Sequence, residues 1–165
     1  MQIVRPPQIV VGVDGSAESR EALAWAAKHA QSVGGTLCVV HAWSPPFVEA
    51  LGVPPLMDWG PLRQRAESFP AAFAREVLGE EPSITVVPRT VRGTPAQVLV
   101  DASKDADLLV VGSRGLGGLK GMLLGSVGHH CAAHAHCPVV IFRAPHRRER
   151  PHVRRGAHTA SRSDT

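Results

Sequence analysis

The residues best suited to chemistry form a glycine-rich loop, Gly112-Ser113-Arg114-Gly115, which nine residues separate from Gly125-Ser126. The apolar run Leu108–Val111 comes directly before it and predicts a buried strand that ends at Gly112. Glycines let a backbone approach a ligand closely, and the first N–H groups of a helix opening at Ser126 have no partners of their own. The pattern therefore predicts an anion site, typically for phosphate, with an ordinary surface loop as the alternative.

A second candidate is Asp14, which follows the apolar run Gln8–Val13 and precedes Gly15-Ser16. A carboxylate at this position could accept a hydrogen bond from a ribose hydroxyl or hold Mg²⁺ through water. The alternative is a simple turn or cap residue. Arg114 and Lys120 could pair with phosphates, although exposed basic residues in glycine loops are usually solvated.

The elements that position these residues alternate between apolar strands and helices. Strands are predicted over residues 8–13, 36–42, 83–91, 108–111 and 138–142. Helices are predicted from a Ser16 cap, over Leu62–Val77 with a kink or late start at Pro70, from the capping box Thr94–Gln97, and from Ser126 to about Ala135. Pro88 places the third strand at a sheet edge.

This alternation predicts an α/β fold, a single doubly wound five-stranded parallel sheet with helices on both faces. The common strand order 3-2-1-4-5 puts the switch point between strands one and four, where ligands bind outside the carboxyl ends. Asp14 ends the first of these strands and Gly112 ends the second. Two loops that are candidates for separate reasons are therefore expected to be neighbours.

Composition divides the 165 residues into one domain with two tails. We expect a flexible segment over residues 1–7, the folded domain over 8–143, and a disordered arginine-rich tail over 144–165. The tail holds the whole excess charge of +4, so the charge does not indicate specific nucleic-acid binding by the folded part. No apolar run is long enough for a membrane span, no signal peptide is recognisable, and three cysteines form no disulfide framework, which together favour the cytoplasm.

Catalytic and metal sites are not indicated. Leu119 stands where a phosphate-binding P-loop needs glycine before Lys120, and Ser113 and Ser126 have no evident base. His130 and His134 share a helix face, yet the neighbouring cysteines, Cys131 and Cys137, are expected to be buried apolar residues, so no metal site is predicted. We predict no catalytic residues.

Several motifs in the same order resemble those of the universal stress protein family, over nearly all of residues 9–142. They are Val11–Ser16, Val40-His41-Ala42, Gly93–Ala96, Val110–Gly115, Gly125-Ser126-Val127 and Cys137–Val140. The glycine loop has the spacing of the family's ATP-binding signature, Gly-x2-Gly-x9-Gly-Ser. One departure is Gly128, where members often carry Ser or Thr, so one phosphate-facing hydroxyl is missing.

The resemblance implies a flavodoxin-like, Rossmann-like domain of the adenine nucleotide alpha hydrolase-like type that binds ATP, with Mg²⁺, and forms homodimers through its last strand, here Val139–Arg143. The positions that it assigns to the nucleotide are Val13, Asp14, Ala42, Gly112, Arg114, Gly115, Gly125, Ser126 and Val127.

From this resemblance we expect a cytoplasmic, nucleotide-dependent regulatory module of the stress response with at most slow ATP hydrolysis. Its regulatory protein partner is not identified by the sequence. One alternative is a slow ATPase or a nucleotide-dependent transferase that uses the proline-rich loop Trp43–Gly60 as a lid. Another is a member without nucleotide binding that acts through protein–protein contacts.

Overall fold

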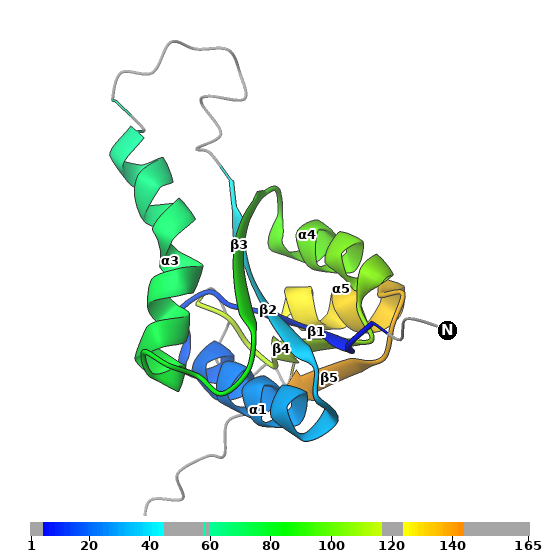
Figure 1. Ribbon diagram of the computed structural model, residues 1–165. Coiled ribbons are helices and arrows are strands. Elements are labelled where there is room, and N and C mark those ends of the chain that lie inside the picture. Colours follow the sequence, from blue (N-terminus) through cyan, green and yellow to red (C-terminus); the bar gives the residue numbers. More distant parts are fainter. Residues whose placement is uncertain (1–4, 45–57, 59, 117–123, 144–165) are drawn as a thin grey trace, which may run out of the picture.

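Five parallel strands form one sheet in the order β3-β2-β1-β4-β5, which confirms the predicted order (Figure 1). The computed structural model describes residues 5–44, 58, 60–116 and 124–143. The strands are β1 (Gln8–Gly12), β2 (Thr36–Trp43), β3 (Val86–Arg92), β4 (Leu108–Gly112) and β5 (Val139–Phe142). The edge position predicted for β3 from Pro88 is confirmed, although this strand begins three residues later than expected.

In the described part of the chain, two pairs of helices cover the two faces of the sheet (Figure 1). Helices α1 (Ala17–Val33) and α3 (Gly60–Leu78) pack on one face, over a core that includes Leu23 and Phe73. Helices α4 (Pro95–Ala102) and α5 (Ser126–His134) pack on the other, over a core that includes Leu99 and Cys131. The central strands are therefore buried on both sides, which explains why their sequences are continuously apolar.

Helix α1 begins at the cap that its sequence predicts. The Ser16 hydroxyl caps it by accepting a hydrogen bond from the Ser19 backbone N–H at 3.1 Å. Gly34 ends the helix in the left-handed conformation, with φ of 62°, which favours glycine. The capped end of α1 lies just after Asp14, so it belongs to the edge of the sheet where the candidate loops meet.

Pro70 lies inside α3, where we expected a kink or a late start. A proline cannot donate the hydrogen bond that the carbonyl of Ala66, four residues earlier, would accept. The Thr90 hydroxyl on β3 donates to this carbonyl instead, at 2.9 Å. A side chain from the neighbouring strand thus replaces the missing backbone donor, and the helix continues through Pro70.

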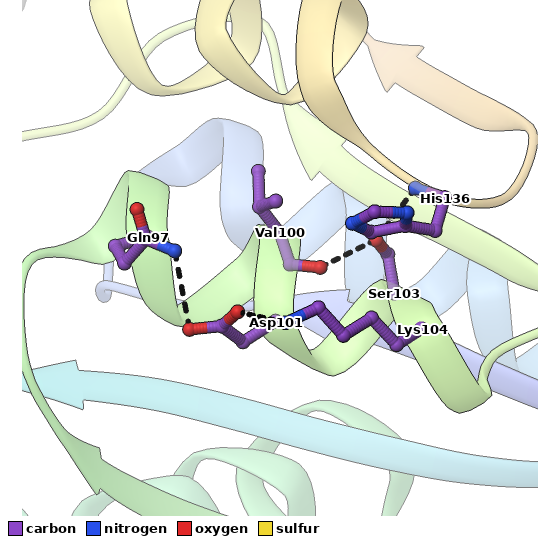
Figure 2. A network of polar contacts seen from close by, with 6 residues as sticks. All are labelled: Gln97, Val100, Asp101, Ser103, Lys104 and His136. Carbon is purple, nitrogen blue, oxygen red and sulfur yellow. Dashed lines mark hydrogen bonds and ion pairs between the residues drawn. The ribbon is translucent and has the colours of Figure 1, made fainter.

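The predicted capping box at the start of α4 is wrong. Thr94 occupies the cap position but makes no side-chain hydrogen bond there, and Gln97 donates to Asp101 one turn later, at 3.2 Å. Asp101 also accepts from Lys104 at 2.7 Å (Figure 2). The side-chain amide of Gln97 is thus hydrogen-bonded to Asp101, one turn later in the same helix, and it does not reach back to the N-cap.

The buried hydroxyl of Ser103 links the end of α4 to the turn before β5 through two hydrogen bonds. The Ser103 hydroxyl lies in the short 3₁₀ turn Ser103–Asp105 and is fully buried. It donates to the Val100 carbonyl at 2.6 Å and accepts from the His136 backbone N–H at 2.9 Å (Figure 2). This hydroxyl therefore fixes the turn that leads from α5 into the edge strand.

Some predictions concern residues outside the described part of the chain. They are the terminal segments over 1–4 and 144–165, Lys120, and most of the proline-rich loop between Trp43 and Gly60. Among the helices that the structure does describe, none has the length and apolar character needed to cross a membrane.

Candidate functional site

A cavity of about 500 Å³ lies at the carboxyl ends of β1 and β4, where the topology predicts a ligand site. The structure brings all nine sequence-predicted positions to its lining: Val13, Asp14, Ala42, Gly112, Arg114, Gly115, Gly125, Ser126 and Val127. Its size is within the range of small-molecule sites, about 300–1,000 Å³. The sequence places Ser113 in the loop but assigns it no role, and it does not identify Glu18 on α1, which contacts the loop.

Asp14 connects β1 to both candidate loops. Its Oδ1 accepts hydrogen bonds from the Ser16 hydroxyl at 2.6 Å and from the Ser16 N–H at 3.0 Å, and its Oδ2 accepts from the Leu116 N–H at 3.0 Å. Burial by itself raises the pKa of this carboxyl, but the hydrogen bonds from Ser16, Leu116 and Ser19 together hold the pKa below its ordinary value. Asp14 is therefore an ionised carboxylate with a fixed orientation beside the cavity.

The glycines of the loop are required by the close approach of neighbouring groups. A Cβ atom on Gly115 would lie 2.5 Å from Oδ2 of Asp14. On Gly112, a Cβ atom would lie 3.0 Å from Cβ of Glu18 and 3.2 Å from its carbonyl carbon. The absence of side chains at these positions lets the loop lie against both Asp14 and the first turn of α1.

Arg114 lines the cavity, and its guanidinium forms an ion pair with Glu18 on α1. Its Nη2 donates to Oε1 of Glu18 at 2.9 Å, across 96 positions in the sequence. The two side chains are 32% and 15% exposed, so this ion pair is less exposed than the other four of the described residues. Its remaining N–H groups are the donors that Arg114 has for a ligand.

Ser113 has a buried hydroxyl without a partner. The residue is 2% exposed, and its Oγ finds no hydrogen-bond partner within the described part of the chain. Its backbone is satisfied, because its N–H donates to Phe142 and its carbonyl accepts from Gly125, both at 2.7 Å. An unpaired buried hydroxyl is unfavourable by about 1–3 kcal/mol, so a donor of this kind beside a cavity indicates a position for a polar ligand atom.

The amino end of α5 faces the same cavity. Gly125 at the cap offers no side-chain hydrogen bond, which leaves the N–H groups of the first turn, from Ser126 to Gly128, without intrahelical acceptors. A side chain at position 128 would be crowded, because a Cβ atom there would lie 2.7 Å from Cδ1 of Leu124. Three N–H groups and the positive end of the helix dipole therefore point to an anion.

The remaining wall of the cavity is largely apolar and comes from β2 and α4, through Ala42, Pro95 and Leu99. Leu99 reaches this wall because residue 12 is glycine: a Cβ atom on Gly12 would lie 2.7 Å from Cδ1 of Leu99. His41 has a structural contact, since its Nδ1 lies 3.0 Å from the Val13 carbonyl and its ring packs on Phe69. The cavity thus has one apolar wall and one polar end.

The histidines and cysteines of α5 lie apart from this cavity's lining. The rings of His130 and His134 pack against each other at 4.4 Å between centroids. Cys131 is fully buried in the core, and burial raises the pKa of its thiol to about 11. Among the described residues, no three His, Cys, Asp or Glu side chains are grouped so that they could hold a metal ion.

Comparison with known proteins connects this arrangement to one family. The family model described as "Universal stress protein family" matches residues 7–143. Universal stress protein Rv2623 of Mycobacterium tuberculosis is 39% identical over 135 residues, which is 82% of this chain and 44% of that protein. The chain thus spans less than half the length of this curated relative.

Solved structures of the same family share the fold. A universal stress protein in complex with cAMP is 30% identical, with a TM-score of 0.55 over 82% of this chain and 95% of its own. The universal stress protein of Archaeoglobus fulgidus in complex with dAMP is 23% identical, with a TM-score of 0.57 over 86% and 99% of the two chains.

Proposed function

Since the chain belongs to the universal stress protein family, we propose that it binds an adenine nucleotide in the cavity between the ends of β1 and β4. The unpaired hydroxyl of Ser113 is the observation that carries this proposal. It lies in the loop that ends β4, and the N–H groups of α5 begin where Gly125 contacts that loop. A phosphate oxygen at this end of the cavity would satisfy both kinds of donor.

Each part of the nucleotide has a matching part of the cavity. The apolar wall that includes Ala42 and Leu99 suits an adenine ring. The carboxylate of Asp14 is ionised and fixed, so it can accept a hydrogen bond from a ribose hydroxyl. The loop from Gly112 to Gly115 and the start of α5 then face the phosphates.

The ligand that we propose first is ATP. Mg²⁺ would bind to the polyphosphate and, through water, to Asp14, because Mg²⁺ keeps several waters and typically uses one or two carboxylates. A nucleoside monophosphate such as the cAMP or dAMP of the related structures is the alternative ligand.

The family name implies a role in the response to stress. We propose that occupancy of the cavity controls a regulatory protein partner in that response. We also propose a homodimer paired through the last strand, Val139–Arg143. The strand β5 lies at the edge of the sheet, and its side chains are half-buried.

The free cysteines, of which Cys38 and Cys131 are buried, favour a reducing compartment such as the cytoplasm.

The test is calorimetric titration of nucleotide-free protein with ATP, ADP, AMP and cAMP, with and without Mg²⁺. We expect one site per chain with a Kd of about 1–100 μM, which corresponds to roughly −8 to −5 kcal/mol. Asp14→Asn should weaken binding, whereas Asp101→Asn, an exposed carboxylate on α4, should not. Absence of binding by all four nucleotides would overturn the proposal.

A further inference from the structure

The ion pair between Glu18 and Arg114 bears on how the site treats phosphate charge. Glu18 lies in the first turn of α1, at the positive end of the helix dipole. Its side chain is only 15% exposed, and its Oε1 is 2.9 Å from Nη2 of Arg114. The pair therefore joins the helix that follows β1 to the loop that follows β4.

Separation of Glu18 from Arg114 would remove stabilising contacts of both residues. The backbone of Glu18 is fixed against the loop, because it occupies the space in which a side chain of residue 112 would lie. Removal of Arg114 would leave a mostly buried carboxylate with the helix dipole as its main compensation. Glu18 thus holds the guanidinium at the wall of the cavity through a short, partly buried contact.

The charge balance at the cavity follows from this contact. In the described part of the chain, the lining of the cavity contains one carboxylate, Asp14, and one guanidinium, Arg114, and no Glu or Lys side chain. Glu18 neutralises Arg114, so Asp14 leaves this end of the cavity with one net negative charge. The charge of Glu18 therefore makes the electrostatic potential in the cavity less favourable for each phosphate that is added to a ligand.

We propose that Glu18 is a specificity-determining residue that, through Arg114, limits how much affinity the site gains from each additional phosphate of a nucleotide. This inference rests on the proposed adenine-nucleotide function. Glu18 acts on the ligand through Arg114, so it is a positioning residue for that guanidinium. Release of Arg114 from Glu18 would increase the preference of the site for triphosphates over monophosphates.

The experiment compares the affinities of adenosine, AMP, ADP and ATP for the wild-type chain and for Glu18→Gln, in EDTA and at low salt. Loss of one carboxylate charge beside a partly buried cation should tighten ATP by about five- to tenfold more than adenosine. Glu21→Gln is the matched control, because Glu21 is an exposed carboxylate on the same helix. Arg114→Gln should weaken ATP more than adenosine, because it removes the cation through which Glu18 acts, and the gain from Glu18→Gln should shrink at high salt.

The possible outcomes separate this inference from the proposed function. An unchanged ratio of ATP to adenosine affinity in Glu18→Gln would overturn the role of Glu18 while leaving nucleotide binding intact. An equal shift in Glu21→Gln, or a wild-type ratio of ATP to adenosine affinity in Arg114→Gln, would overturn it as well. If the wild-type chain binds none of the four ligands, the proposed function fails, and this inference falls with it.

Discussion

The carboxylate of Asp14 occupies the space that a side chain at Gly115 would need, since a Cβ atom on Gly115 would lie 2.5 Å from Oδ2 of Asp14. The same oxygen accepts a hydrogen bond from the next residue, through the Leu116 N–H at 3.0 Å. The end of β1 and the loop after β4 therefore hold one another in place through one carboxylate and one missing side chain.

We predict that Gly115→Ala displaces the Asp14 carboxylate and lowers nucleotide affinity by at least about tenfold, or roughly 1.4 kcal/mol. Gly125→Ala is the matched variant, because its Cβ atom would make an ordinary contact, 3.5 Å from the Ser113 carbonyl oxygen. It should weaken binding less, whereas a bulky residue at 125 should fill the cavity. Calorimetry with thermal unfolding checks both effects, and wild-type affinity in Gly115→Ala would contradict the site.

Ser113→Ala should affect stability and binding in opposite directions. Removal of a buried hydroxyl that has no partner should raise the free energy of unfolding of the ligand-free protein by about 1 kcal/mol. The same change should weaken nucleotide binding by about five- to tenfold, because one donor to the ligand is lost. Urea unfolding and titration measure the two effects, with exposed Ser68→Ala as the control. A loss of stability together with unchanged affinity would show that Ser113 is only a packing residue.

The hydrogen bond between Thr90 and Ala66 predicts a dependence on Pro70. Thr90→Val should lower the free energy of unfolding by about 1–2 kcal/mol, because it leaves the Ala66 carbonyl without its donor. In a Pro70→Ala background the helix regains a backbone N–H for this carbonyl, so the same substitution should have a smaller effect. A double-mutant cycle by urea unfolding measures the coupling. Equal losses in both backgrounds would contradict our account of Pro70.

The lowered pKa of Asp14 predicts a contribution to stability that depends on pH. Because the folded-state pKa lies below that of the unfolded chain, about 3.9, this contribution is fully present above the unfolded pKa. It is lost as the pH falls through the folded pKa. Between pH 6 and pH 3 the wild-type chain should therefore lose more stability than Asp14→Asn in urea unfolding. Glu80→Gln controls for the loss of an exposed carboxylate, and parallel curves for wild type and Asp14→Asn would contradict the prediction.

The strand order and the convergence of Asp14 with the glycine loop could be predicted, because apolar runs and turn glycines are local signals with regular spacing. The contact of Glu18 with Arg114 could not, because it joins residues 96 positions apart, and an acidic residue in a first helical turn has an ordinary explanation. Ser113 was visible in the motif, but only the packing around it shows that its hydroxyl lacks a partner. Gln97 was misread because its interaction with Asp101 satisfies its amide within the helix.

Gly12 and Leu99 share one volume at the end of β1, which has a consequence for sequence evolution. A side chain at 12 requires Leu99 to shift or to be replaced by a smaller residue, since a Cβ atom on Gly12 would lie 2.7 Å from Cδ1 of Leu99. Homologues that replace this glycine should therefore carry a compensating change on α4. The two positions should co-vary as a pair, although they lie 87 positions apart in the chain.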